Sequence, residues 1–265
     1  MFRRIVPALL LCMGIFASQL LAQTSTTGVL AGAVIDPTGA LVPDANITLQ
    51  DVARGATQST TANKQGEYRF ELLLPGTYSV TVKAKGFQSI VQRVEVTVGA
   101  VTTDNLKLSL GTETTTVEVS GEAPLMQTES GNVNATVLET QAANIPNPGN
   151  DLTYMAQIAP GSVANTAGGG LGNFSSYGIS AVANLFTVNG MDDNDPFLNV
   201  NNSGATNLTL GQNEIQEVGV VTNGYSGQYG GLAGANVNYI TRSGTNRFHG
   251  RASWFWNGDA LNATC

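Results

Sequence analysis

The chain has 265 residues, of which 42% are hydrophobic and only 12% are charged, with a formal net charge of −7 at pH 7. Its 12 basic residues are scattered along the chain, which argues against nucleic-acid binding, because that function needs clustered positive charge. The 31 glycines, together with many threonines, asparagines and serines, are typical of a β-rich extracytoplasmic protein.

The N-terminus has the layout of a secretory signal peptide. Two arginines at positions 3 and 4 precede an apolar run over residues 5–17, and a small-residue stretch ends at Ala22. We expect residues 1–22 to be removed, although a short N-terminal anchor is the alternative. Cleavage removes Cys12 and leaves Cys265 as the one remaining cysteine, so no intramolecular disulfide can form.

Residues 23–110 are predicted to form an antiparallel β-sandwich of about seven strands. Apolar and polar residues alternate over residues 45–50, 77–82, 94–98 and 106–110. This period of two indicates strands with one buried and one wet face. Turn signals separate the runs at residues 36–39, 64–66, 75–76 and 85–86.

The same part of the chain resembles a known family. GAVIDPTGALVPDANITLQ (residues 32–50) and NKQGEYRFELLLPGTYSVTVKAKGFQ (residues 63–88) are similar to the carboxypeptidase-regulatory-like domain. The resemblance implies a transthyretin-like sandwich, which in TonB-dependent outer-membrane proteins often precedes a plug domain. Tyr68, Phe70 and Tyr78 are expected to be core aromatics, and a carbohydrate-stacking role is the alternative.

Residues 111–131 are expected to be a mobile linker, since they are rich in threonine and glutamate and hold little to bury. An alternating segment within them resembles a TonB box, the short stretch that TonB captures by β-augmentation, which requires an extended and unpaired strand. Its residues are Thr115, Thr116, Val117, Glu118, Val119, Ser120 and Gly121. The alternative is that Val117 and Val119 form the last strand of the sandwich.

Residues 132–250 resemble the plug domain of TonB-dependent outer-membrane receptors, especially the Oar-like group that has an N-terminal sandwich. The family's elements follow in order at residues 133–140, 145–161, 186–195, 212–221 and 237–241. The resemblance implies an α+β plug that fills a barrel of about 22 strands and gates energised uptake of a large or scarce nutrient. The plug-motif residues are Asn189, Gly190, Asp192, Asn194, Asp195, Tyr229, Gly230, Gly234, Ser243 and Gly244.

Two features of this part invite other interpretations, and a third departs from the family's usual sequence. Residues 192–195 carry four oxygen-bearing side chains but lack the spacing and the bidentate glutamate of an EF-hand, so we expect an Asx-rich turn rather than a calcium site. The glycine-rich residues 168–172 lack the Lys-Ser/Thr of a P-loop. Residues 147–150 read Asn-Pro-Gly-Asn where the family usually has Asn-Gly-Arg, so an arginine is missing.

Residues 251–265 resemble the beginning of the barrel. Trp254, Phe255 and Trp256 are expected to be membrane-interface aromatics on the first strand, and a soluble strand with surface tryptophans is the alternative. We expect the chain to be a truncated N-terminal part of a receptor that ends just inside the barrel. Such a fragment alone cannot close a channel, because lipid does not tolerate unpaired strand edges.

No catalytic residues, metal ligands or cofactors are predicted. His249 is the only histidine, and neither G-x-S-x-G nor H-E-x-x-H occurs, so we expect His249 to be structural. The predicted fold class is mainly β: a seven-stranded transthyretin-like sandwich, an α+β plug and the start of a truncated outer-membrane barrel.

The function predicted from the sequence is that of the N-terminal part of a TonB-dependent outer-membrane transporter. Its expected partners are the TonB energising complex, the outer membrane and an unidentified nutrient, with no nucleic acid. The expected location is the outer membrane, or the periplasm for the isolated fragment. The alternative is a soluble periplasmic binding or adhesion protein built from a β-sandwich and a small α+β domain.

Overall fold

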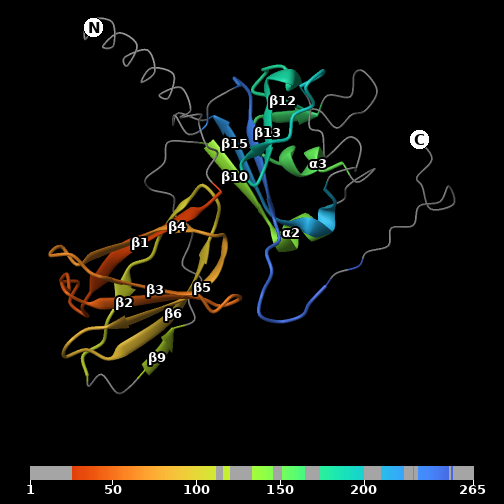
Figure 1. The fold of residues 1–265 in the computed structure, drawn as a ribbon. Helices are drawn as coiled ribbons and strands as arrows, with labels where there is room; N and C mark the ends of the chain where they lie inside the picture. The colour runs from red at the N-terminus through yellow and green to blue at the C-terminus, as the bar shows by residue number, and fades with distance from the viewer. Residues whose placement is uncertain are drawn as a thin grey trace, which may run out of the picture.

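The computed structural model describes residues 26–111, 116–119, 133–145, 151–164, 174–199, 210–223, 229, 232–250 and 252. Strands dominate these residues and gather into two units, each with its own hydrophobic core (Figure 1). The prediction of a mainly β protein is confirmed. The expected signal peptide, the altered turn at 147–150, the glycine-rich loop at 168–172, Gly230 and the aromatics Trp254, Phe255 and Trp256 lie outside the described residues.

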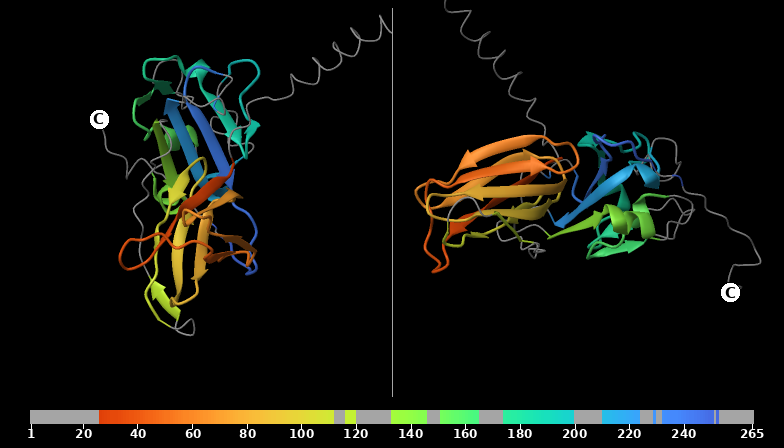
Figure 2. Two further views of the ribbon diagram at one scale, coloured as in Figure 1. Left: turned by 90° about the vertical axis from the view of Figure 1, so that its left-hand side faces the viewer. Right: turned by 90° about the horizontal axis from the view of Figure 1, so that it is seen from below.

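The first unit, residues 26–119, consists of two sheets that pack face to face (Figure 2). In one sheet β1 (Gly28–Ile35) pairs with β4 (Glu67–Leu73), β7 (Val101–Thr103) and β8 (Leu106–Lys107). The other sheet has the order β3 (Thr57–Thr61), β2 (Asn46–Asp51), β5 (Gly76–Lys83), β6 (Ser89–Val96) and β9 (Thr116–Val119). The described part of this unit therefore has more strands than the seven expected, because short β7 and β8 follow β1 in parallel and β9 comes from the expected linker.

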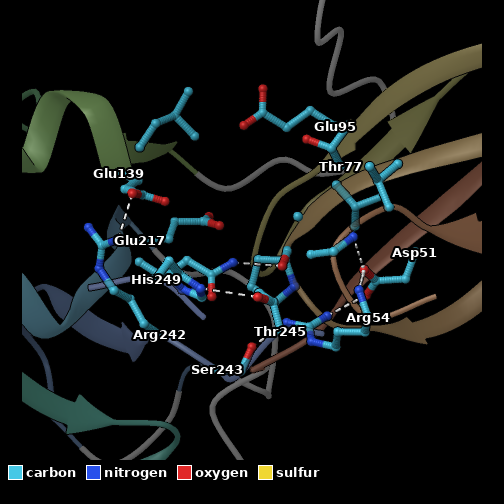
Figure 3. A pocket seen from close by; sticks show the side chains of 17 residues that line it. Asp51, Arg54, Thr77, Glu95, Glu139, Glu217, Arg242, Ser243, Thr245 and His249 are labelled. Atoms are coloured by element: carbon cyan, nitrogen blue, oxygen red, sulfur yellow. Dashed lines mark hydrogen bonds and ion pairs between the residues drawn. The ribbon is translucent and has the colours of Figure 1, made fainter. Parts of the chain in front are cut away.

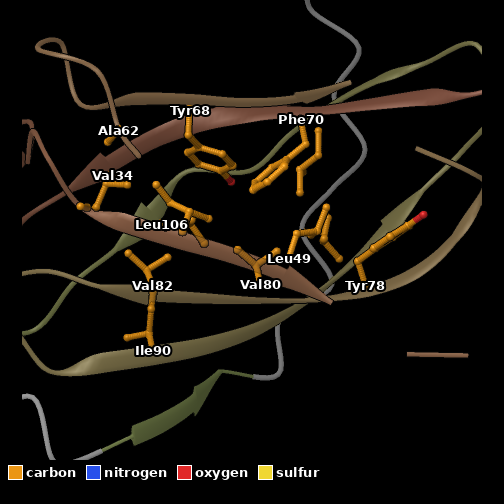
Figure 4. Packing of buried hydrophobic residues seen from close by; sticks show 14 of the residues in the cluster. Val34, Leu49, Ala62, Tyr68, Phe70, Tyr78, Val80, Val82, Ile90 and Leu106 are labelled. Atoms are coloured by element: carbon orange, nitrogen blue, oxygen red, sulfur yellow. The ribbon is translucent and has the colours of Figure 1, made fainter. Parts of the chain in front are cut away.

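Side chains that alternate inward from both sheets form the core of the first unit (Figure 4). Leu49 and Val80 meet Tyr68 and Phe70 there, and the two rings make an edge contact with centroids 6.2 Å apart. Tyr68, Phe70 and Tyr78 are at most 5% exposed, so these three rings have no open face on which a sugar could stack. They are core aromatics, as the sequence analysis expected.

The second unit, residues 133–250, is built around a five-stranded mixed sheet. Its order is β10 (Val133–Leu138), β15 (Ile215–Asn223), β16 (Asn236–Thr241), β13 (Leu185–Val188) and β14 (Met191–Asp192). Only the β13–β16 pair in this sheet is parallel. The remaining elements are α2 (Glu139–Asn144), α3 (Thr153–Ala156), β11 (Ser162–Ala164), β12 (Phe174–Ser176), η2 (Ala181–Ala183) and η3 (Gln212–Glu214).

One face of this sheet packs on α2 and α3 (Figure 1). Val218, Val220 and Tyr239 point into this core and meet Leu152 and Met155. Because side chains alternate along a strand, the neighbouring Glu217 and Gly219 of β15 point to the opposite face, toward the first unit. No helix in the described part of the chain is both long enough and apolar enough to span a membrane.

Candidate functional site

The hairpin between β13 and β14 carries the first part of the expected plug motif. Asn189 (φ +50°) and Gly190 (φ +81°) are its two loop residues, and two consecutive positive φ angles are the signature of a type I′ turn, for which Asn-Gly is preferred. The Asn189 side chain donates to Thr241 Oγ1 (2.8 Å) and accepts from the Thr241 amide (3.1 Å). The turn is therefore fastened to the end of β16.

Asp192 and Asp195 continue the motif as Asx turns, and Asn194 lies between them. Asp192 Oδ1 accepts from the Asn194 amide (2.9 Å), and Asp195 Oδ1 accepts from the Phe197 amide (2.7 Å). Asn194 Oδ1 accepts from the Phe186 amide (2.7 Å), which links the turn to β13. These oxygens serve backbone N–H groups, as expected for an Asx-rich turn. Among the described residues, no group of three or more His, Cys, Asp and Glu is arranged to hold a metal ion.

Gly234 permits a close approach of two backbone segments. A Cβ at this position would lie 2.4 Å from Asn184 Oδ1 and 2.7 Å from the Ala183 carbonyl oxygen. Asn184 is fully buried, accepts from the Ala235 amide (2.9 Å) and donates to the Phe174 carbonyl (2.8 Å). Gly234 belongs to the predicted plug motif, whereas the role of Asn184 could not be predicted, since one asparagine in an asparagine-rich chain carries no signal of burial.

Three other motif residues lie toward the first unit or beyond β16. The hydroxyl oxygen of Tyr229 lies 2.9 Å from where a Cβ on Gly99 would stand, so Tyr229 contacts the turn that follows β6. Ser243 Oγ accepts a hydrogen bond from the Arg54 guanidinium of the first unit. Gly244 has no atom within 4 Å of a Cβ position, so space does not require a glycine there.

The candidate TonB box falls partly in β9, the last strand of its sheet. Thr116–Val119 pair in parallel with residues 89–92 of β6. The expectation of an unpaired segment is therefore wrong for these four residues, and the alternative that places Val117 and Val119 in the sandwich's last strand agrees with the structure. Thr115, Ser120 and Gly121 lie outside the described residues, and capture by TonB stays a prediction.

The outer face of β15 forms one contact between the two units. The Val98 amide, from the β6–β7 turn, donates to Glu217 Oε1 (2.8 Å). The Val98 side chain packs on Gly219, where an added Cβ would lie 2.9 Å from Val98 Cγ1. Gln216 Nε2 donates to the Pro75 carbonyl (2.8 Å). Two hydrogen bonds and one close packing contact thus join β15 to the first unit.

The segment after β16 forms a further contact, because it runs back beside the first unit (Figure 1). The Asn246 amide donates to the Ala53 carbonyl (3.3 Å), and its side chain donates to the Arg54 carbonyl (2.7 Å). Arg54 also forms an ion pair with Asp51 (2.5 Å) in addition to its bond to Ser243. These contacts hold the β2–β3 turn against the second unit.

A cavity of about 320 Å³ lies between the two contacts (Figure 3). Its charged and titratable lining comes from both units: Asp51, Arg54, Glu95, Glu139, Glu217, Arg242 and His249. Arg242 forms an ion pair with Glu139 (2.6 Å). His249 Nδ1 lies 3.1 Å from Thr245 Oγ1 and 2.8 Å from the Arg247 carbonyl, both within its own turn.

Glu217 is the most unusual charged group at this interface, because it is only 3% exposed. Burial raises the pKa of its carboxyl to about 7, against the lowering effect of the hydrogen bond from Val98, and the nearby Glu95 raises the pKa further. Glu217 lies in the stretch 212–221 that was expected to be a plug element, but its burial could not be predicted from the sequence. Alternation identifies the face on which a side chain lies, but it does not reveal that a turn of another unit covers that face.

The chain is similar to known proteins in its first unit and over most of its length. Residues 29–109 match the family model of the carboxypeptidase regulatory-like domain. The chain is 26% identical over 260 residues to the TonB-dependent transporter Oar of Myxococcus xanthus, a match that covers 94% of this chain and 23% of the relative. The chain therefore spans about a quarter of the length of this relative.

Two solved structures are similar to about a third of this chain. The Bacillus anthracis TIE protein is 20% identical, with 32% of this chain and 17% of that chain covered at a TM-score of 0.30. Catechol 1,2-dioxygenase from an Acinetobacter species is 12% identical, with 36% and 59% covered at a TM-score of 0.28. The family-model match and the sequence similarity to Oar together support a relationship to TonB-dependent receptors.

Proposed function

We propose that this chain is the N-terminal part of a TonB-dependent outer-membrane transporter and that its second unit is the plug that gates energised uptake of a nutrient. The observation that carries the proposal is the similarity to the Oar transporter over 94% of the chain, since it includes both units and not the sandwich alone. The nutrient is unidentified, and the outer membrane is the proposed location.

The second unit has features suited to a gate. Its sheet packs on α2 and α3 on one face and against the first unit at β15. The Asn189–Gly190 hairpin and the Asx turns after it are fixed by side-chain hydrogen bonds rather than by a large apolar core. Breaking such side-chain hydrogen bonds requires less free energy than opening a packed core, because water can replace the lost hydrogen bonds.

The position of β9 suits capture by TonB. A strand at the end of a sheet offers its outer row of N–H and C=O groups to an incoming strand. β9 is the last strand in the order β3-β2-β5-β6-β9. TonB therefore adds a strand to the outer edge of Thr116–Val119 in this proposal, while β6 holds the inner edge.

A pull-down with the periplasmic part of TonB tests this step. The chain should retain TonB, and Val119→Pro should weaken retention at least tenfold, because proline removes a ladder donor and fixes φ. Glu129→Pro is the matched control, since it places a proline in the same expected linker but outside residues 115–121, and it should bind as the unmodified chain does. Undiminished retention by Val119→Pro would reject the box.

A further inference from the structure

The contact between Val98 and Glu217 places a carboxyl group where the two units meet. Glu217 is buried at 3% exposure, accepts the Val98 amide of the first unit at 2.8 Å and lines the cavity between the units. A buried carboxylate is costly unless it is paired. No cation among the described residues pairs with Glu217: Arg54 is bonded to Asp51 and Ser243, and Arg242 is bonded to Glu139.

The other charged groups around the cavity do not compensate a negative charge on Glu217. Glu95 on β6 repels a charged Glu217. Asp51 and Arg54 at the β2–β3 turn form one ion pair, and Glu139 at the start of α2 forms another with Arg242 after β16. His249 contacts Thr245 and Arg247 within its own turn. When Glu217 loses its proton, the buried negative charge thus has only the Val98 amide as a described hydrogen-bond partner.

We propose that Glu217 is a proton-controlled latch that holds the second unit against the β6–β7 turn and releases it as the pH rises toward neutrality. The geometry supplies the latch: one hydrogen bond, the close packing of Val98 on Gly219, and a cavity through which water and protons reach the carboxyl. The remaining contacts, which Gln216, Tyr229, Ser243 and Asn246 make with the first unit, limit how far the units separate.

The direction of the pH effect follows from linkage. Burial raises the pKa of Glu217 from 4.5 to about 7 in the docked state. Docking is therefore strongest below about pH 4.5 and weakens as the pH rises through the docked pKa near 7. Between these two values the docking equilibrium constant should fall by up to about tenfold for each pH unit, since one proton is released on undocking.

Distances between spin labels on the two units measure docking directly. The labels are attached to two introduced cysteines: Gln58→Cys on the exposed strand β3, and Val163→Cys on β11 at a residue that is 63% exposed. Cys12→Ser and Cys265→Ser remove the native thiols, so that only the introduced cysteines react with the label. The full chain should give one narrow distance at pH 5 and a growing, longer population by pH 8.

Glu217→Gln is the decisive variant, because its amide oxygen still accepts from Val98 and carries no charge at any pH. It should keep the narrow distance at both pH values. Glu95→Gln should reduce the pH response, and Glu71→Gln, a change at an exposed carboxyl on β4, should leave it unaltered. Asp104, whose pKa burial raises to about 6, lies within the first unit, so its titration should leave the distance between the units unchanged.

Two outcomes would overturn the latch. The first is a wild-type distance distribution that is the same at pH 5 and pH 8. The second is a Glu217→Gln variant that separates with pH as the wild type does, which would assign the response to another group. Neither outcome bears on whether the chain is part of a transporter, so the latch and the proposed function fail separately.

Discussion

Gly234 and Gly244 belong to the same sequence motif, yet the structure constrains them differently. A Cβ on Gly234 would enter the space of Asn184 Oδ1 and the Ala183 backbone, whereas a Cβ on Gly244 would meet nothing within 4 Å. Neither residue has a positive φ angle. The difference between the two sites is therefore one of space alone, which makes them a matched pair for mutation.

Gly234→Ala should lower the free energy of unfolding of the second unit by about 3 kcal/mol, because the backbone must move to accept the methyl group. Gly244→Ala should change it by less than about 0.5 kcal/mol. Urea denaturation followed by circular dichroism measures both. Equal stability of the two variants would show that the close approach at Asn184 is not a constraint in solution.

At the scale of elements, alternation in the sequence predicted several strands but not how they pair. Residues 77–82 and 237–241 were expected to be strands, and they lie in β5 and β16. β9 was expected to be unpaired, because a short alternating run carries no information about a partner that lies far away in the sequence. The Asn-Gly turn could be predicted more fully, since its backbone preference is local.

The Asn189–Gly190 hairpin gives a test at this scale. Asn189→Val should destabilise the second unit by about 2 kcal/mol, because a β-branched residue is strained at φ +50° and both hydrogen bonds to Thr241 are lost. Asn189→Gly keeps the turn and loses only the hydrogen bonds, so it should cost about 1 kcal/mol.

Hydrogen exchange of the Thr241 amide reports on both variants of the hairpin, since this amide donates to Asn189 Oδ1. Protection should fall in both, and it should fall further in Asn189→Val. A valine variant as protected as the wild type would contradict a turn fixed by positive φ and side-chain bonding.

At the scale of the whole molecule, the sequence predicted the two units but not the interface between them. Val98 ends one alternating run, residues 94–98, and Glu217 lies within another expected element, residues 212–221. Their meeting depends on the tertiary arrangement of a turn and a strand that are more than a hundred residues apart. The cavity, its ion pairs and the buried carboxyl could not be inferred for the same reason.

The proposed membrane-associated function rests on the similarity to the Oar transporter, which extends over both units. In this account the sandwich lies beside the second unit, which is the proposed plug, and hydrogen bonds join the two. The strand β9 and the second unit therefore belong to one connected structure. The competing account, a soluble periplasmic binding or adhesion protein, uses the same two units without a membrane partner.

The location of the native gene product in fractionated cells tests the central claim most directly, with detection by an antibody against residues 26–111. We predict that the product sediments with the outer membrane and stays there through washing with high salt. Release with the soluble periplasmic proteins on osmotic shock would contradict the transporter and favour the soluble binding protein.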